Sequence, residues 1–481
     1  MEKREQNTLS RTIIKTMGMF GSIQVFNILC SIIRTKLIAL WIGPVGMGLF
    51  AIFNSAIEMI GNITNLGLRT SSIRNISQET NNGGKLNRIC TVVRRWTLVL
   101  GILGAIVIAS ASPLLSQMSF GDKNHIWGYI ALSIAVLANT LTNGEHSILQ
   151  GTSLLRKLAK ASLYGAFTGL LLSSPLFYFL GEDSIIPSII CYSLSILFFS
   201  YLLRNKNVGI QGETLSIKDT INLGKDFLKL GIFITLTDIA SQITNYAFIS
   251  YLNNASSTEM VGYYQTGYTL IAKYTALIFS SLGVEYFPRL SKVSHSNIRL
   301  NTFVSQEINI VLMILTPVII AFILCRRLII SILYSPDFFI IETFISVGII
   351  GMIFRAISWC MAFVILAKGT GKIFFITEIT STIIFLFLYI PAFNIFGLNG
   401  FGVAFLLWYL FYSIIIAFVY YRKFRLKLNI ACYKWLIWSL ITSSTALLLM
   451  ETNNTIATIV LLIVTTAYSA MEFKKLFSHK N

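Results

Sequence analysis

The sequence has 481 residues, of which 55% are hydrophobic and only 12% charged, and its mean hydropathy is +0.72. Soluble domains carry about 25% charged residues, so this composition excludes a soluble multidomain enzyme, a disordered chain and a small disulfide-stapled protein. The 38 Lys and Arg against 20 Asp and Glu give a net charge of +18. Such a surplus is typical of nucleic-acid or anionic-lipid binding or, in an apolar chain, of the positive-inside bias of membrane proteins.

Apolar segments of about twenty residues, the length that crosses a bilayer, recur along the whole chain. Only short connections rich in Gly, Pro, Asp and Asn separate them, and none is long enough to hold an extramembrane catalytic domain. We therefore expect an all-α polytopic membrane protein. The fourteen predicted transmembrane helices span residues 13–40, 46–67, 97–115, 126–149, 159–180, 184–203, 228–252, 259–282, 303–325, 338–367, 373–396, 399–420, 432–450 and 455–473.

The cations are distributed unevenly between the two ends of these predicted helices. With the N-terminus placed in the cytoplasm, 31 of the 38 lie in the N-terminal segment, the even-numbered connections and the C-terminal tail. Three, Lys123, Arg326 and Arg327, lie on the opposite side. This bias predicts a multi-pass membrane protein with both termini in the cytoplasm. Because the cations are dispersed over short loops, the sequence argues against nucleic-acid binding.

Cysteine and histidine indicate no metal chemistry. The six cysteines and four histidines are scattered, with no CxxC pair and no HExxH sequence. There is also no Walker A sequence, which argues against ATP hydrolysis by this chain. We expect neither a metal site nor a cofactor.

Polar side chains recur at helical spacing within the predicted membrane helices. A cation at mid-membrane costs about 2.5–3.5 kcal/mol, so such residues usually face water or a partner. The four intramembrane cations are Arg34, Lys36, Lys273 and Arg355. Accompanying polar stripes are Gln24, Asn27 and Ser31 on the first predicted helix; Asn54, Glu58, Asn62 and Asn65 on the second; Thr235, Asp238, Gln242 and Asn245 on the seventh; and Gln265 and Thr269 on the eighth.

A shared aqueous cavity is one interpretation of these stripes, and three others stay open. Asn, Ser and Thr also hydrogen-bond neighbouring helices. Arg34 and Lys36 lie near the end of a long helix, from which they could extend outward to the interface. Glu58 and Asp238 could simply neutralise the intramembrane cations.

The two halves of the chain resemble each other weakly. Gly46–Phe50 is similar to Val261–Tyr264 at an offset of 214 residues, which superimposes Gln24 on Asp238. Repeated bundles around a midplane cavity are characteristic of alternating-access transporters. We therefore expect two pseudo-symmetric six-helix bundles around a central cavity, followed by two C-terminal helices. The predicted segments are a bundle at 1–204, a cytoplasmic linker at 205–227, a bundle at 228–425, and helices 13 and 14 with the tail at 426–481.

Several motifs resemble the oligosaccharide-lipid flippases of the polysaccharide transporter family, within the multidrug/oligosaccharidyl-lipid/polysaccharide exporter superfamily. Residues 333–378 are especially similar to Wzx-type O-antigen and enterobacterial common antigen translocases. Those translocases often end after twelve helices, so helices 13 and 14 have no counterpart in the motifs. The resemblance is carried by Arg34–Ala39, Gly43–Phe50, Asn65–Leu68, Val261–Gln265 and Leu333–Phe338, continued by Gly351, Arg355, Ala367, Lys368 and Glu378.

This resemblance implies a flippase of the bacterial inner membrane that moves an undecaprenyl-diphosphate-linked oligosaccharide, such as an O-antigen repeat unit, from the cytoplasmic to the periplasmic leaflet. It further implies alternating access, coupling to H+ or Na+, contact with membrane lipids, and a polysaccharide polymerase and a chain-length regulator as partners. Cations would compensate the diphosphate. The resulting role assignments are Arg34, Lys36, Lys273 and Arg355 for the diphosphate; Gln24, Asn27, Ser31, Asn54, Asn62, Gln242, Asn245 and Gln265 for the sugar; and Glu58, Asp238, Glu342 and Glu378 for coupling or gating.

Three other functions remain to be distinguished. A multidrug/cation antiporter of the same superfamily would favour an acidic cavity, whereas this one is expected to hold four cations. A lipid II flippase would be cationic and of similar helix count. A membrane polysaccharide polymerase or ligase would carry a sizeable outer loop, and the outer loops here are short. The sequence thus favours a transporter over an enzyme.

Overall fold

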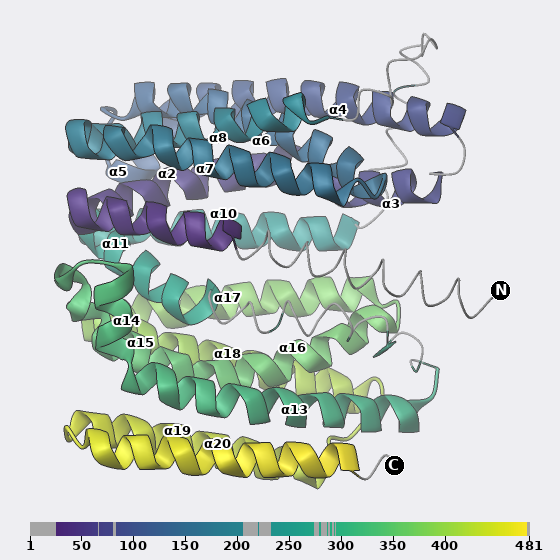
Figure 1. Cartoon of the computed structure of the whole chain (residues 1–481), viewed down its shortest axis with the longest axis vertical. Helices are drawn as coiled ribbons and strands as arrows, with labels where there is room; N and C mark the ends of the chain where they lie inside the picture. Colours follow the sequence, from purple (N-terminus) through teal and green to yellow (C-terminus); the bar gives the residue numbers. More distant parts are fainter. Residues whose placement is uncertain are drawn as a thin grey trace. The chain divides into compact units, whose positions relative to one another are not determined.

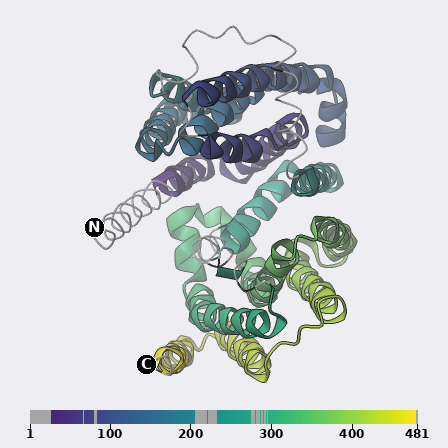
Figure 2. The same ribbon diagram turned by 90° about the vertical axis from the view of Figure 1, so that its right-hand side faces the viewer.

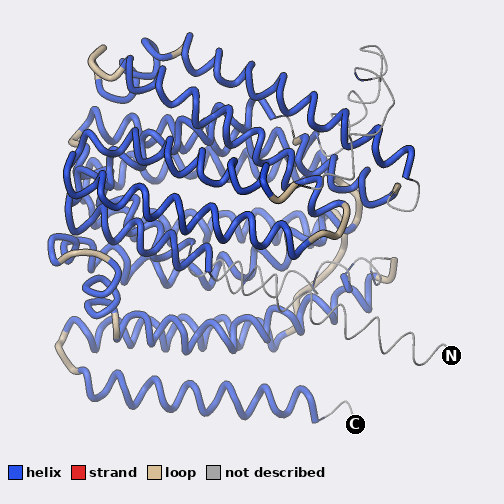
Figure 3. The backbone as a smooth tube through the Cα atoms, turned by 45° about the horizontal axis from the view of Figure 1, so that its top comes forward, coloured by secondary structure: helices blue, strands red, loops and turns tan. Residues whose placement is uncertain are grey.

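The computed structural model describes residues 26–65, 67–79, 83–204, 220, 232–273, 279, 286, 289, 290, 293 and 295–478. Over these ranges the backbone forms helices and turns without a strand (Figure 3). Among the described residues, eight helical segments are long and apolar enough to cross a bilayer, and three of them, Leu155–Leu202, Pro336–Ala367 and Gly371–Arg422, each hold two α-helices joined by a short 3-10 helix. The chain is therefore an all-α, multi-pass membrane protein. The count of fourteen helices stays a prediction, because several predicted helices extend outside the described residues.

The chain divides into two compact units, unit 1 at Met1–Gly262 and unit 2 at Tyr263–Asn481. The division falls within α11 (Thr258–Tyr268), which continues into a π-helical turn, η2 (Thr269–Lys273).

Unit 1 is a bundle of long antiparallel helices (Figure 1). Helix α7 packs on α8, helix α6 packs on both α4 and α8, and α10 lies against α2 and α5 despite its distance in the sequence. Ahead of α2, residues 26–41 are also helical. The labelled helices are α2 (Gly43–Asn65), α3 (Leu68–Gln78), α4 (Gly83–Ser110), α5 (Ser112–Phe120), α6 (Ile126–Gly151), α7 (Leu155–Leu180), α8 (Ile185–Leu202) and α10 (Ile232–Ala255), with the 3-10 helix η1 (Gly181–Ser184) between α7 and α8.

Small residues set the closest helix contacts in unit 1. A Cβ atom on Gly165 of α7 would lie 2.7 Å from the Ile196 Cα of α8, and one on Gly169 would lie 2.7 Å from the Tyr192 ring. Membrane helices associate through such close backbone approaches, because lipid removes the hydrophobic drive between them. The outward faces stay apolar, as on α4, where Val99 and Ile106 are both 59% exposed.

A hydroxyl network joins α10 to α5 and α6 within unit 1. The Ser119 hydroxyl lies 2.8 Å from the Tyr246 hydroxyl and 3.2 Å from the Ser250 hydroxyl. Tyr129 of α6 donates to the same Ser119 oxygen at 3.0 Å. These buried polar groups satisfy one another where water is scarce, which fixes α10 against the rest of unit 1.

Unit 2 is built around α13 and α18. Helix α18 packs against α15, α16 and α17, whereas α13 packs against α16, α19 and α20; Figure 2 shows these helices nearly end on. The elements are α13 (Asn297–Leu324), α14 (Arg326–Leu333), η3 (Pro336–Ile341), α15 (Glu342–Gly348), η4 (Ile349–Gly351), α16 (Met352–Ala367), α17 (Gly371–Phe396), η5 (Gly397–Asn399), α18 (Gly400–Arg422), α19 (Ile430–Glu451) and α20 (Thr455–Ser478).

The predicted last two helices, 432–450 and 455–473, coincide closely with α19 and α20. Helix α20 packs chiefly against α13 and α19. Its apolar side chains stay largely uncovered, with Ile456 75% and Ile463 62% exposed, as expected of a helix that faces lipid.

Candidate substrate cavity

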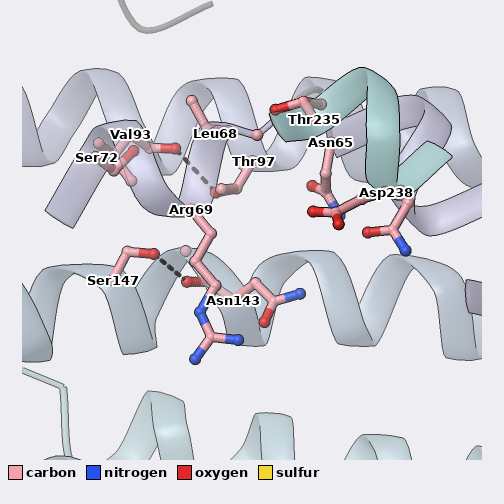
Figure 4. A pocket seen from close by; sticks show the side chains of 13 residues that line it. Asn65, Leu68, Arg69, Ser72, Val93, Thr97, Asn143, Ser147, Thr235 and Asp238 are labelled. Carbon is pink, nitrogen blue, oxygen red and sulfur yellow. Dashed lines mark hydrogen bonds between the residues drawn. The ribbon is translucent and has the colours of Figure 1, made fainter. Parts of the chain in front are cut away.

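A cavity of about 250 Å³ lies among α2, α3, α4, α6 and α10 of unit 1. Its lining is rich in carboxamides and hydroxyls and includes one arginine and one carboxylate (Figure 4). The polar side chains are Asn62 and Asn65 of α2; Arg69 and Ser72 of α3; Thr97 of α4; Asn143 and Ser147 of α6; and Thr235 and Asp238 of α10.

The turn between α2 and α3 positions these two helices on two sides of the cavity. Gly67 has a φ of +71°, the left-handed conformation that glycine adopts without a steric cost. A Cβ atom there would lie only 2.2 Å from the Thr235 Oγ1 atom of α10. Glycine is therefore required both by the backbone angle and by the close approach of α10.

A second close approach, between α4 and α6, forms the opposite wall. A Cβ atom on Gly144 would lie 2.6 Å from the Thr97 Cγ2 atom. The Thr97 hydroxyl donates to the Val93 carbonyl at 2.9 Å, and the Ser147 hydroxyl donates to the Asn143 carbonyl at 2.7 Å (Figure 4). Since these hydroxyl protons are used within their own helices, the lone pairs of the oxygens remain as acceptors.

A buried ion pair joins α4 and α6 beside this wall. The Arg94 Nε atom lies 2.8 Å from the Glu145 Oε1 atom, and a terminal guanidinium nitrogen lies 3.2 Å from Oε2. The bidentate geometry is the strongest form of this pair. Arg94 was counted among the loop cations in the sequence, but it lies within the candidate span Gly84–Ser110, where Glu145 compensates its charge.

Of the predicted site residues, Asn62 and Asp238 line the unit 1 cavity, together with Asn65 and Thr235 of the same polar stripes. In Figure 4 the Asn65 and Asp238 side chains point toward one another. Arg69 and Asn143 were not predicted as site residues. Arg69 continues the spacing of Glu58, Asn62 and Asn65 by one more turn, which is the signal that identifies it in retrospect.

Arg34 lies elsewhere in unit 1, between α2 and α8. Its guanidinium carbon is 4.8 Å from the Phe50 ring centroid and 4.1 Å from that of Tyr192, so two aromatic faces stabilise the cation. The Arg34 Nε atom is buried without a hydrogen-bond partner in the described part of the chain. Lys36 follows on the same helical segment and is half-buried.

Arg355 of α16 occupies an aromatic setting in unit 2. A terminal guanidinium nitrogen donates to the Ala272 carbonyl at 3.2 Å, and the guanidinium carbon lies 5.3 Å from the Tyr409 ring centroid and 5.9 Å from that of Phe279. Ala272 belongs to the π-helical turn η2, which ends at Lys273. The structure thus brings Arg355 to the backbone segment that carries a second predicted cation, whose side chain lies outside the described atoms.

The predicted acidic residues have different surroundings. Glu342 begins α15 and accepts from the Arg326 Nε atom at 2.6 Å and the Arg327 Nε atom at 2.7 Å. Glu378 of α17 accepts a hydrogen bond from the Tyr412 hydroxyl of α18. Glu58 is exposed on α2.

The predicted sugar-facing residues are likewise dispersed. Gln24 lies outside the described residues. The Asn54 side-chain amide donates to the Phe50 carbonyl at 2.8 Å, whereas the Asn27 Oδ1 atom is buried without a described partner. Ser31 is exposed, and Gln242, Asn245 and Gln265 are half-buried on α10 and α11.

These features define a multi-pass membrane protein whose interior contains cations and sugar-compatible polar groups. The chain matches the family described as polysaccharide biosynthesis protein over residues 37–341, which is more than half of its length, and it therefore belongs to that family. Its predicted membership of the polysaccharide transporter family, within the multidrug/oligosaccharidyl-lipid/polysaccharide exporter superfamily, is confirmed.

Relatives and solved structures agree with this membership. The chain is 22% identical over 382 residues to the lipid III flippases of Escherichia coli (strain K12) and Shigella flexneri, covering 75% of this chain and 88% of each relative. Its fold is similar to the lipid II flippase MurJ in an inward closed conformation, with a TM-score of 0.72, 16% identity and coverage of 95% and 99% of the two chains. An inward-facing multidrug resistance MATE family transporter gives a TM-score of 0.67, 15% identity and coverage of 87% and 95%.

Proposed function

We propose that this protein is a flippase that translocates an undecaprenyl-diphosphate-linked oligosaccharide from the cytoplasmic to the periplasmic leaflet of the bacterial inner membrane by alternating access. The observation that carries the proposal is its similarity to the lipid III flippases, which extends over 88% of those proteins. In this proposal both chain termini face the cytoplasm, as the cation distribution predicts.

The chemistry of such a substrate requires buried cations. A diphosphate is too costly to move through hydrocarbon without compensation, and guanidinium groups bind phosphate oxygens in a bidentate manner. We assign this role to Arg34 and Arg355, with Lys36 and Lys273 contributing further charge. The aromatic rings beside Arg34 and Arg355 stabilise each cation without neutralising it, so its charge remains available to the substrate.

Sugar hydroxyls require neutral donors and acceptors. Asparagine and glutamine amides offer both, and serine hydroxyls add to them. The residues assigned to the sugar are Gln24, Asn27, Ser31, Asn54, Asn62, Gln242, Asn245 and Gln265. We further propose an O-antigen-like repeat unit as the oligosaccharide and a polysaccharide polymerase with its chain-length regulator as partners.

We assign the four predicted acidic residues to two roles, gating and ion coupling. Glu342 is held by Arg326 and Arg327, and such a pair suits a gate that opens and closes with the transport cycle. Glu58, Asp238 and Glu378 are assigned to coupling with H+ or Na+. The multidrug antiporter alternative is disfavoured because the arginines of the membrane helices would repel a cationic drug.

A lipid II flippase is the second candidate, favoured by one observation. The similarity to MurJ has a TM-score of 0.72 and covers 99% of that structure. Since this likeness concerns the fold alone, a functional assay has to decide between the two lipid-linked substrates.

Complementation in two strains distinguishes the candidates. We expect the wild-type chain to restore growth or glycan display in an Escherichia coli strain lacking its lipid III flippase, and not in one depleted of its lipid II flippase. Arg34→Ala, Lys273→Ala and Arg355→Ala should each lose rescue at wild-type membrane levels. Rescue only of the second strain would establish the lipid II alternative, and full rescue by all three variants would overturn the cationic mechanism.

A further inference from the structure

The unit 1 cavity contains an arginine to which the substrate assignment above gives no role. Arg69 lines the cavity from the first turn of α3, and it is an exposed residue. Within the described ranges, no carboxylate forms an ion pair with it and no acceptor bonds to it. Arg94, in contrast, is fully engaged by Glu145. Arg69 is therefore a cation available to a ligand.

The backbone around Arg69 adds further donors. The first hydrogen bond of α3 runs from the Ser71 N–H to the Gly67 carbonyl at 3.3 Å, so the preceding N–H groups have no carbonyl within the helix. The first turn of α3 contains no acidic residue. This end of the helix therefore attracts negative charge.

An orphaned hydroxyl elsewhere in the lining of the same cavity supplies an independent observation. The Ser72 side chain is fully buried and lines the cavity. Its Oγ atom has no hydrogen-bond partner within the part of the chain that the structure describes. A buried polar atom without a partner is costly, and a ligand oxygen or a water in the cavity would satisfy it.

The other polar side chains of the cavity differ in their chemistry from Arg69, Ser72 and the first turn of α3. Asn62, Asn65 and Asn143 present carboxamides to the cavity, and Asp238 adds a carboxylate. Figure 4 shows Asn65 and Asp238 together, apart from Ser72. Amides and a carboxylate suit a polyhydroxylated ring, whereas a guanidinium and free N–H groups suit a phosphate.

We propose that the unit 1 cavity binds the junction between the phosphate and the first sugar of the lipid-linked substrate. Arg69, the N-terminal turn of α3 and Ser72 contact the phosphate oxygens, and Asn62, Asn65 and Asn143 contact the sugar hydroxyls. The inference rests on the proposed function and adds a specific subsite to it. Because the basic connections predict the cytoplasmic side for α3, this subsite receives the substrate before translocation.

The same phosphate chemistry is present in an anionic phospholipid headgroup. The carboxamides favour the glycosylated ligand, because a phospholipid offers no sugar ring to them. Three probes separate these sources: a short-chain polyprenyl diphosphate, the same lipid carrying N-acetylglucosamine, and phosphatidylglycerol.

Binding of each probe to the purified full-length chain in nanodiscs of zwitterionic lipid tests the subsite. Arg69→Gln should weaken both polyprenyl probes about tenfold, because a hydrogen bond to a charged group is lost. Asn143→Asp and Asn143→Leu should weaken only the glycosylated probe. Arg74→Gln is the matched control, since it removes the same charge from the same helix but does not line the cavity, and it should bind all probes as the wild type does. Circular dichroism and the thermal midpoint check that each variant is folded.

Three results would overturn the inference. Wild-type binding by Arg69→Gln and both Asn143 variants would show that the cavity is not used, while leaving the proposed function intact. Equal losses of phosphatidylglycerol and polyprenyl diphosphate in Arg69→Gln would assign the cavity to phospholipid headgroups. Failure of the wild-type chain to bind either polyprenyl probe would refute the proposed function and this inference with it.

Discussion

The surroundings of an arginine side chain differ between unit 1 and unit 2. Around Arg69, unit 1 provides carboxamides, hydroxyls and open space. Around Arg355, unit 2 provides a backbone carbonyl and aromatic rings, and these rings continue through Tyr268, Phe405 and Trp408. Units of similar helical construction therefore need not share the same chemistry. An open polar cavity selects a ligand through hydrogen bonds, whereas an aromatic enclosure holds one charge in a fixed place.

The largest expected effect comes from the aromatic enclosure of unit 2. Arg355→Ala should abolish complementation, because it removes a cation that the Ala272 carbonyl and the rings of Tyr409 and Phe279 hold in place. Arg355→Lys should retain partial function, since the charge persists without the planar guanidinium. Rescue is measured at matched membrane abundance, with Arg422→Ala at the exposed end of α18 as the control. Wild-type rescue by Arg355→Ala would show that the aromatic enclosure of unit 2 has no role in transport.

The second prediction concerns stability in unit 1. Arg94→Ala leaves Glu145 buried and unpaired, which should destabilise the fold by about 3 kcal/mol. The pair replacement Arg94→Met with Glu145→Leu should recover most of that loss, whereas Arg69→Ala should change stability little because no ion pair is broken. Reversible unfolding in mixed micelles measures all three. Equal losses for Arg69→Ala and Arg94→Ala would contradict the distinction between a ligand-binding arginine and a structural one.

The third prediction tests the turn that shapes the unit 1 cavity. Gly67→Ala should destabilise by about 1–2 kcal/mol, because it forces a side chain into the left-handed region and against the Thr235 hydroxyl. Adding Thr235→Ala should recover the share of the lost stability that comes from the steric contact, and leave the share that comes from the left-handed backbone conformation. The measurement is thermal unfolding of the single and double variants. No difference between Gly67→Ala and the double variant would show that the contact with α10 does not limit the turn.

The smallest expected effect lies again in unit 2. Tyr412→Phe removes the hydrogen bond to Glu378 and should cost about 1 kcal/mol in stability. If Glu378 takes part in coupling, the same change should also shift the pH dependence of transport in proteoliposomes. Tyr421→Phe, at an exposed position of the same helix, serves as the control. A transport profile identical to the wild type would restrict this hydrogen bond to a structural role.

Hydropathy predicted the class of fold because hydrocarbon demands helices whose backbone groups bond internally. It placed the start of one helix near residue 97, whereas α4 begins at Gly83. The error arises from four cations near the start of α4, Lys85, Arg88, Arg94 and Arg95, because a hydropathy window treats such residues as part of a loop. The partner of Arg94, Glu145, lies 51 positions away, and one-dimensional periodicity contains no information about such a pairing.

The candidate site was predictable only in part for a related reason. Helical spacing on α2 and α10 identified Asn62 and Asp238, which the structure brings to one cavity. Arg69 keeps the spacing of the stripe, but the predicted helix ends at residue 67, so Arg69 was assigned to the connection that follows. Asn143 belongs to a polar stripe on α6, together with Asn139, His146 and Gln150, which the sequence prediction did not use; its packing against α3 and α4 brings it to the cavity.

Helix α20 has a mechanical consequence for the membrane around the protein. Its candidate membrane span, Thr455–Lys475, has 21 residues and extends roughly 32 Å at 1.5 Å per residue, close to a hydrocarbon core of about 30 Å. A thinner bilayer would therefore make α20 tilt, and a thicker one would have to thin around it. Because it packs chiefly against α13 and α19, few neighbours resist such tilting. A change in acyl-chain length should reorient α20 before it disturbs the helices around the unit 1 cavity.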